Sequence, residues 1–234
     1  MKYGNGKKSI ILKFIILAAV IYGVIMSTDD PNTFSKFTTL SNIGIGAAML
    51  LFIIVESIGL RSGKDFRKQW MFVFKFMMTI GVIITFAMYI TMIAPKSDQG
   101  LLGSYANHHY GSLMLHMISP VLSVADFYIF DDKYAPKMIH SVFSILPPLA
   151  YVGLIYVMAL NGHRWAHGMS APYAFINFGA ETGWWGWDLS IASSTTTGIG
   201  TAYMILLLMA VFVLIGMIML LIKRKQKASR ELSR

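Results

Sequence analysis

The chain has 234 residues, of which 56% are hydrophobic and 13% charged, and it contains no cysteine. A soluble domain of this length carries about 25% charged residues, so the apolar excess predicts a chain whose solvent is the lipid bilayer. The lack of cysteine excludes disulfide bonds, thiol catalysis and cysteine-ligated zinc, and the net charge of +9 comes from short basic clusters beside apolar runs, which argues against nucleic-acid binding.

Six apolar stretches are long enough to cross a hydrocarbon core of about 30 Å, which takes about 20 helical residues. They cover residues 9–27, 34–60, 69–94, 110–130, 138–160 and 200–222. Backbone groups in lipid must be hydrogen-bonded internally, so we expect each stretch to be a helix. The predicted fold class is therefore all-α, a polytopic integral membrane protein with six transmembrane helices in a single domain over residues 1–234.

The basic residues orient these spans. Fifteen of the 20 Lys and Arg residues lie at the amino terminus, in the second and fourth connections and in the carboxyl-terminal tail, whereas Lys36, Lys96 and Arg164 fall on the other side. The positive-inside rule then predicts that both termini are cytoplasmic. The first span follows a basic segment but lacks a small-x-small cleavage site, so we expect it to be a retained helix.

A cluster of polar residues occupies the outer end of the second span. Thr38, Ser41 and Asn42 are neighbours at i, i+3 and i+4 on a helix. Thr38 lies four residues into its span, within about two turns of the outer surface. A buried threonine often bonds back to a carbonyl one turn earlier, so the ordinary interpretation of this cluster is helix packing.

The third and fourth spans carry opposite charges at similar depth in the inner half. Lys75 lies about two turns above the cytoplasmic surface, and Asp126 lies about one turn above it. Charged side chains inside a membrane are costly unless they are paired. We therefore expect a structural ion pair, with an ion-coupled relay as the alternative.

The fourth span has one polar face. Its members are separated by steps of 4, 3, 4 and 3 residues, which places them on one side of a helix: Ser112, His116, Ser119, Ser123 and Asp126. His116 lies at the same depth as Thr38, and a hydroxyl beside an imidazole suggests a nucleophile and its general base. A histidine that is satisfied by an interhelical hydrogen bond is the ordinary alternative.

The connection over residues 161–199 is long for a compact domain, and such loops are often functional. Trp165, Trp184, Trp185 and Trp187 are expected at the headgroup level, so the segment is either an interfacial flap or a lid. His163 and His167 could share a metal with Glu181, but a HExxH motif is lacking and we expect no metal and no cofactor.

Three short segments, in this order along the chain, resemble segments of one family. Residues 37–42 (FTTLSN) resemble a helix-two segment, residues 116–120 (HMISP) with Asp126 a helix-four segment, and residues 172–177 (PYAFIN) a segment before the last helix. The chain is similar in these positions to the family of the androgen-induced protein and the androgen-dependent tissue-factor-pathway-inhibitor-regulating protein, especially its bacterial six-helix members. It departs from the family's Tyr-Pro order by having Pro172 before Tyr173.

The resemblance implies an intramembrane hydrolase of fatty acid esters of hydroxy fatty acids, with a threonine nucleophile and a histidine. The histidine corresponds to His116. The threonine corresponds to Thr38 if the preceding aromatic is the anchor, or to Thr39 if Asn42 is matched to the family's Asp or Asn. A step of one residue turns a helical side chain by about 100°, and Thr38 faces the same way as Ser41 and Asn42, which favours Thr38.

In this hypothesis Thr38 attacks the carbonyl of a lipid or fatty-acyl ester and His116 takes its proton. Asn42 or Ser41 would donate to the oxyanion. Asp126 lies about 15 Å along the helix from His116, too far to orient the imidazole. The candidates for a further member of the site are His109, Tyr173 and Asn177. Ser112 and Ser119 are expected on either side of the imidazole, on the same helix face. The expected location is a bacterial plasma membrane.

A function of another class is a small transporter or lipid-binding protein with a polar pathway along the fourth helix. A pathway needs polar side chains in both halves of several helices, whereas an enzyme needs one concentrated pocket. The second span has no polar side chain between Asn42 and Glu56, which favours the pocket.

Overall fold

The computed structural model describes residues 6–96 and 100–232, where the chain is helical and forms no named strand. Six helical stretches are long and apolar enough to cross a membrane: Gly6–Met26, Phe37–Ser62, Gln69–Thr91, Gly111–Phe130, His140–Leu160 and Thr201–Arg230. The prediction of six helical spans is confirmed, and their number indicates a multi-pass membrane protein. Lys2 and Arg234, which belong to the basic clusters, lie outside the described residues.

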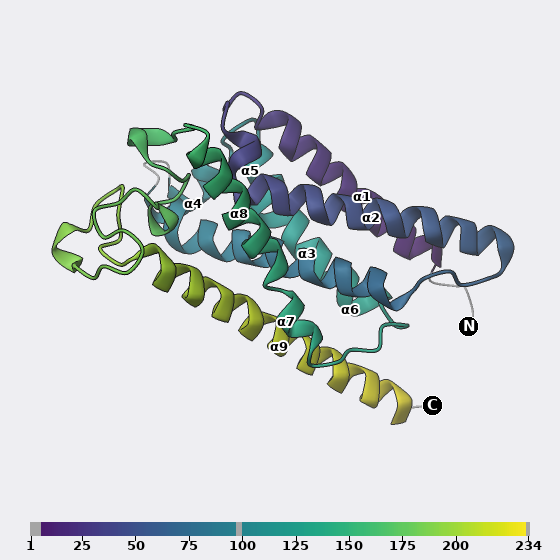
Figure 1. The fold of residues 1–234 in the computed structure, drawn as a ribbon. Helices are drawn as coiled ribbons and strands as arrows, with labels where there is room; N and C mark the ends of the chain where they lie inside the picture. Colours follow the sequence, from purple (N-terminus) through teal and green to yellow (C-terminus); the bar gives the residue numbers. More distant parts are fainter. Residues whose placement is uncertain (1–5, 97–99, 233–234) are drawn as a thin grey trace.

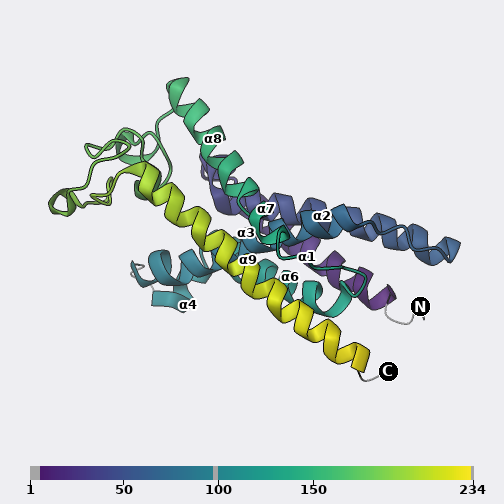
Figure 2. The same ribbon diagram turned by 60° about the horizontal axis from the view of Figure 1, so that its bottom comes forward.

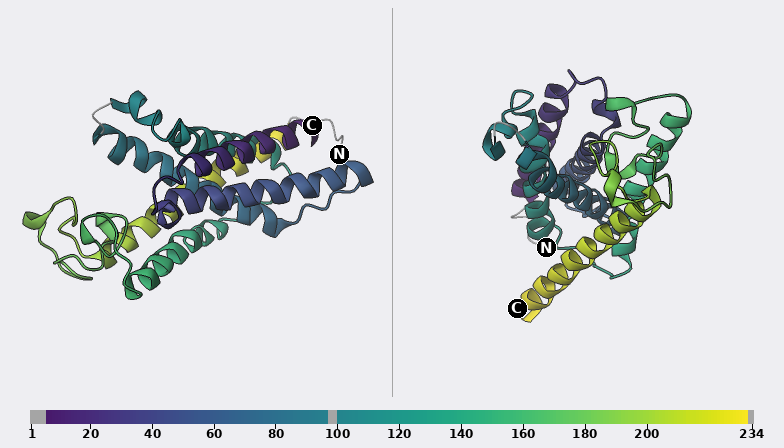
Figure 3. Two further views of the ribbon diagram at one scale, coloured as in Figure 1. Left: turned by 90° about the horizontal axis from the view of Figure 1, so that it is seen from above. Right: turned by 90° about the vertical axis from the view of Figure 1, so that its left-hand side faces the viewer.

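The main helices are α1 (Gly6–Met26), α2 (Phe37–Ser62), α3 (Gln69–Met88), α4 (Gly100–Tyr105), α5 (Gly111–Leu113), α6 (Ser119–Phe130), α7 (His140–Phe143), α8 (Leu146–Leu160) and α9 (Thr201–Leu232). In Figure 1, α1 begins and α9 ends at the same end of the bundle, together with the connections 63–68 and 131–139. We call this the terminal end. The opposite end, which carries the segment 161–200, is the loop end (Figure 3).

Helix α3 forms the centre of the bundle. Its side chains Phe72, Phe76 and Ile80 are buried in one apolar core with side chains of α2, α6 and α9. A second core joins α1, α2 and α3 around Ile16 and Ile45. Helix α9 runs along one side of the bundle and is the least buried of the six spans (Figure 2). Burial of apolar surface between helices thus fixes α3, whereas most of α9 stays exposed.

Three of the expected spans are interrupted, each next to a proline. The third span ends in a π turn, η3 (Tyr89–Ile93), shortly before Pro95, and the fourth contains a π turn, η5 (Met114–Ile118), shortly before Pro120. The fifth span is divided into α7 and α8, and α8 has proline in its first turn. A proline lacks an N–H and clashes with the carbonyl four residues earlier, so a regular α-helix cannot pass through these points unchanged.

Candidate active site

Two π turns meet near the loop end. Tyr89 belongs to η3 and His116 to η5, and their rings stack with centroids 4.1 Å apart and planes 21° apart. The Ser112 hydroxyl donates to the Tyr89 hydroxyl at 3.0 Å. Because π turns widen a helix locally, they are frequent at functional sites. Here they bring an imidazole and a phenol from two helices face to face, which fixes the plane of the His116 ring.

The two nitrogens of His116 have different surroundings. One ring nitrogen bonds to the backbone of Thr85 on α3, whereas Nδ1 is buried and has no hydrogen-bond partner among the described residues. The bonded nitrogen is therefore Nε2, which donates to the Thr85 carbonyl. A neutral imidazole has one N–H and one lone pair, so this bond leaves the lone pair on Nδ1. The imidazole is thus held in the form that can accept a proton.

Thr38 is the second residue of α2, at a helix end without a side-chain cap. The first N–H groups of a helix have no acceptor within it. The Phe37 N–H donates to the Tyr173 hydroxyl at 3.2 Å, and that hydroxyl also hydrogen-bonds with the Thr38 side chain. Burial raises the pKa of Tyr173, which keeps the phenol protonated and able to donate. Tyr173 therefore joins the site as one of the sequence candidates.

Thr39 has a different environment from Thr38. Thr39 is buried, with 2% of its surface exposed, whereas Thr38 is half-buried and lies against the Tyr173 hydroxyl. A nucleophile has to be reached by its substrate. The geometry therefore favours Thr38 of the two neighbouring threonines.

Asn42 links the end of α2 to the π turn that carries His116. Its Nδ2 donates to the Thr38 carbonyl at 2.9 Å and to the Leu115 carbonyl at 3.1 Å, so these two oxygens are at most about 6 Å apart. Ser41 donates to the Thr38 carbonyl at 3.1 Å. The proposed oxyanion donors Asn42 and Ser41 are therefore occupied by backbone carbonyls. Among the first-turn N–H groups of α2, those of Phe37 and Thr38 meet the Tyr173 hydroxyl, and that of Leu40 bonds to the Lys36 carbonyl.

The structure brings Thr38 and His116 to the same end of the bundle but does not join their side chains. No hydrogen bond between the Thr38 hydroxyl and the imidazole is found within the described residues. The link is indirect, through the Asn42 amide. Catalytic hydrogen bonds are often long or absent without substrate, so this spacing leaves room for a water or a rotamer change between them.

Two sequence candidates lie outside this group. His109 is exposed in a left-handed turn with φ of 49°, and its carbonyl accepts from the Tyr22 hydroxyl. Asn177 organises the loop segment: its Oδ1 accepts from the Ser170 backbone, and its Nδ2 donates to the Thr195 carbonyl at 2.8 Å. Both residues hold backbone in place, and neither reaches Thr38 or His116 by a hydrogen bond within the described chain.

Trp165 also departs from expectation. It is buried rather than placed at the headgroup level, and its indole N–H donates to the Ser35 hydroxyl at 2.7 Å. The other three tryptophans of the loop are exposed. Trp165 thus anchors the loop segment to the chain just before α2, which holds Tyr173 over Thr38.

A buried ion network fills the terminal half of the bundle. Lys75 Nζ lies 2.5 Å from Asp126 Oδ2 and 2.5 Å from Asp131 Oδ1. Lys13 of α1 donates to Asp126 Oδ1 at 2.8 Å. The sequence showed Lys13 inside a span but gave no partner for it, and Asp131 was not singled out. All four side chains are fully buried, so Lys75 and Asp126 form part of a larger network.

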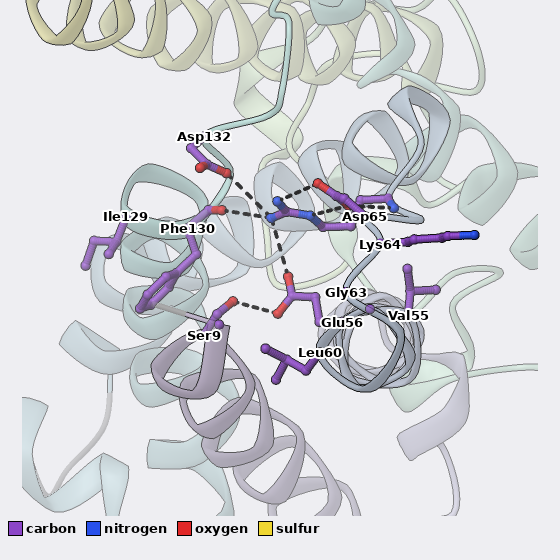
Figure 4. A pocket seen from close by; sticks show the side chains of 13 residues that line it. Ser9, Val55, Glu56, Leu60, Gly63, Lys64, Asp65, Ile129, Phe130 and Asp132 are labelled. Atoms are coloured by element: carbon purple, nitrogen blue, oxygen red, sulfur yellow. Dashed lines mark hydrogen bonds and ion pairs between the residues drawn. The ribbon is translucent and has the colours of Figure 1, made fainter. Parts of the chain in front are cut away.

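A cavity of about 330 Å³ lies at the terminal end, between α1, α2, α6 and the connection 63–68 (Figure 4). Arg67 crosses it and pairs with Asp65 at 3.0 Å, with Asp132 at 3.5 Å and with Glu56 at 3.8 Å. Burial alone would raise the pKa of Asp65, but hydrogen bonds from Arg67 outweigh it and lower this pKa to about 2.

A second cavity, of about 470 Å³, lies in the loop segment and is lined in part by Arg164, His167 and Glu181. His163 is directed elsewhere, toward the Asn32 side chain at 3.2 Å. Within the part of the chain that the structure describes, no three His, Asp or Glu side chains are grouped to hold a metal ion.

The comparisons with family profiles, with curated proteins and with solved structures gave no match to the chain.

Proposed function

We propose that the chain is an intramembrane lipid-ester hydrolase with Thr38 as nucleophile and His116 as general base. One observation carries the proposal. The His116 imidazole has a buried Nδ1 with no hydrogen-bond partner among the described residues, in a turn that Asn42 ties to the helix end bearing Thr38. A histidine that only stabilised packing would be expected to satisfy both ring nitrogens.

The reaction divides into two steps. The Thr38 hydroxyl attacks the ester carbonyl carbon while His116 Nδ1 takes its proton, directly or through one water. The C–O bond of the alcohol then breaks, and His116 returns the proton to the leaving oxygen. In the second step a water gives its proton to His116, attacks the threonine ester and releases the fatty acid, and Thr38 recovers its proton.

The beginning of α2 supplies the electrostatic support for this reaction. Thr38 is the second residue of this helix, where the positive end of the helix dipole lies. The Tyr173 hydroxyl can add a further donor. Donors that are already aligned stabilise an oxyanion because they need not reorganise during the reaction, and one such donor is worth about 10²–10³ in rate.

The substrate class follows from the surroundings of the site. The spans present exposed apolar side chains along their length, so an acyl chain can reach the loop-end half from the bilayer. The resemblance of residues 37–42 and 116–120 to the androgen-induced protein family favours fatty acid esters of hydroxy fatty acids. The basic clusters favour a cytoplasmic terminal end in a bacterial plasma membrane, with the site in the outer half.

The test is hydrolysis of these esters, and of simple lipid esters, by purified protein. We expect Thr38→Ala and His116→Ala to lose at least about 10³-fold in kcat, because each removes a reacting group. Thr39→Ala and a matched control at the same end, Thr28→Ala, should keep activity near that of the wild type. Thr28 lies in the turn after α1, and its hydroxyl donates to the Ile25 carbonyl at 2.7 Å. Full activity in both Thr38→Ala and His116→Ala would refute the proposal.

A second candidate, a polar pathway, is favoured by the ion network. The terminal half carries polar side chains from four elements: Ser9 and Lys13 of α1, Glu56 of α2, Lys75 of α3 and Asp126 of α6. Polar side chains in both halves are the sequence criterion for a pathway. α2 has Asn42 in its loop-end half and Glu56 in its terminal half, and the fourth span has Ser112 and Asp126 in the same two halves.

A further inference from the structure

Five polar residues follow one another along the fourth span, and we call them the polar seam: Ser112, His116, Ser119, Ser123 and Asp126. Ser119, Ser123 and Asp126 are completely buried, and Ser112 is 8% exposed near the loop end. The seam therefore runs inside the protein rather than along the lipid. It joins the loop end to the ion network.

The middle of the seam contains unsatisfied hydroxyls. Ser119 Oγ and Ser123 Oγ have no hydrogen-bond partner within the described residues. At the loop-end side, Asn42 Oδ1 and His116 Nδ1 are unpartnered in the same way. Buried polar atoms are almost always hydrogen-bonded, and a serine in a helix readily bonds its own backbone instead. These four buried atoms lack a partner within the described residues, and the usual partner of such atoms inside a protein is an ordered water.

The spacing suits single waters. Ser119 and Ser123 are about 6 Å apart along the helix axis, and Ser123 and Asp126 about 4.5 Å. One water that accepts from one group and donates to the next spans about 5.5 Å. A chain of hydroxyls and waters at this spacing can pass a proton, because each hydroxyl accepts one proton and donates another.

At the terminal end the seam enters the ion network through Asp126. Lys13 connects Asp126 to the Ser9 hydroxyl at 2.6 Å, and Ser9 donates to Glu56 Oε2 at 2.8 Å. Asp131 Oδ2 and Glu56 Oε1 accept no hydrogen bond from the described residues. Glu56 Oε1 is ion-paired with Lys13 at 3.5 Å and Arg67 at 3.8 Å without a hydrogen bond, so both carboxylates keep an acceptor position at which a proton can bind.

Glu56 and Ser9 also line the cavity at the terminal end (Figure 4). The network thus reaches a cavity that opens between α1, α2 and α6. The charged groups around the network come from every element packed against it: Lys13, Glu56, Asp65, Arg67, Lys75, Asp126, Asp131, Asp132 and Lys223. Burial also raises the pKa of Asp131 above its usual value, which fits a carboxyl that exchanges its proton.

We propose that the polar seam is a proton relay across the membrane, from the cavity at the terminal end through Glu56, Asp126, Ser123, Ser119 and His116 to the loop end. One proton enters at a carboxylate and one leaves at the loop end, and no bond other than O–H and N–H bonds is made or broken. This activity goes beyond ester hydrolysis and needs no ester.

The test uses purified protein in liposomes that contain a pH-sensitive dye, with a potassium gradient and valinomycin to drive proton entry and no ester present. We expect the wild type to admit protons severalfold faster than protein-free liposomes. The Ser119→Ala, Ser123→Ala double variant should return the rate nearly to that of protein-free liposomes. Both hydroxyls are unpartnered, so their removal should leave the melting temperature unchanged or higher.

The matched control is Ser144→Ala, a buried serine whose hydroxyl bonds the Ser141 carbonyl away from the seam. It should conduct like the wild type. Asp126→Asn provides a second variant, expected to conduct slowly. A wild-type rate equal to that of protein-free liposomes, or a folded double variant that conducts like the wild type, would overturn the relay. Neither result bears on the hydrolase proposal, because ester hydrolysis is measured separately.

Discussion

Pro120 shows how a single residue shapes the candidate site. It has no N–H for the carbonyl of His116, four residues earlier, and its ring would clash with that carbonyl in a regular α-helix. The chain forms the π turn η5 directly before it, and this turn carries His116 onto the Tyr89 ring. Pro120 was visible in the sequence, but a proline can kink a helix or widen it. Whether the helix kinks or widens depends on its packing against the facing helix, and the sequence of one span does not show that packing.

The contacts of the polar residues with neighbouring helices could not be predicted from the sequence either. Helical spacing predicted one face for Ser112, His116, Ser119, Ser123 and Asp126, and the last three lie in the regular helix α6, where they are fully buried. The π turn that holds His116 departs from 3.6 residues per turn. The spacing could not say which atoms of neighbouring helices they meet. Asn42 was expected to donate to an oxyanion, yet both its amide hydrogens bond to backbone carbonyls. Partners across helices are a property of packing.

A conservative substitution of Tyr173 tests whether its hydroxyl takes part in the reaction. In Tyr173→Phe the ring remains and only the hydroxyl that contacts Phe37 N–H and Thr38 is lost. We expect kcat for ester hydrolysis to fall by about 10²-fold, since a donor to the oxyanion is removed. The free energy of unfolding should fall by only about 1 kcal/mol, the usual worth of one hydrogen bond.

The control for this change is Tyr156→Phe in α8. The Tyr156 ring packs against Phe178 and Trp184 of the loop segment. The control substitution should leave kcat unchanged. If Tyr173→Phe were as active as the wild type, the phenol would have no part in the reaction, and its contact with Thr38 would be structural only.

At the scale of elements, α1 and the fourth span approach closely through two glycines. A Cβ on Gly23 would lie 2.6 Å from the Leu115 side chain, and a Cβ on Gly111 would lie 3.0 Å from Met26 Cβ. Small residues let membrane helices pack backbone to backbone. This contact presses α1 against η5 and so supports the position of His116.

Gly23→Ala should therefore separate α1 from η5. We expect the free energy of unfolding to fall by about 1–3 kcal/mol, because the new methyl group overlaps the buried Leu115. Thermal unfolding in detergent measures the change. Gly153→Ala in α8 is the matched control, since a Cβ there meets nothing within 4 Å and alanine favours the helix by up to about 1 kcal/mol. Equal melting temperatures for the two variants would show that the close approach is not needed.

The positions of the six spans could be predicted from apolar length, to within a few residues at all ends but the last, because the bilayer sets that length. The last helix continues beyond residue 222, through the basic tail, to Leu232. The loop segment 161–199 could not be predicted in this way. Its order comes from individual long-range contacts, such as the Trp165 indole on Ser35 and the Asn177 side chain on Thr195. No sequence periodicity predicts such contacts. The four tryptophans of the segment were therefore expected in the same surroundings, although one is buried and three are exposed.

At the scale of the whole molecule, the account needs the terminal end in the cytoplasm. The chain has no cysteine, so single cysteines can be introduced without background. We expect Ser194→Cys, exposed in the loop segment, to react with a membrane-impermeant maleimide on intact cells, and Lys64→Cys in the connection 63–68 to react only after permeabilisation. The reverse pattern would place the candidate site in the inner half of the membrane.

In the proposals above, the whole molecule has two halves with different roles around one helix. The loop-end half holds Thr38 and His116 beneath Tyr173, and the terminal half holds the ion network and its cavity. The polar face of the fourth span connects them. Its outer members would serve the chemistry of an ester, and its inner members would supply protons.

The most direct test of the central claim, a threonine nucleophile assisted by a histidine, is covalent capture. Purified protein is treated with a fluorophosphonate probe, and the modified residue is identified by mass spectrometry. The account predicts an adduct on the Thr38 hydroxyl that is lost in Thr38→Ala and strongly slowed in His116→Ala. An adduct on Thr39, or labelling that is equally fast in His116→Ala, would contradict it.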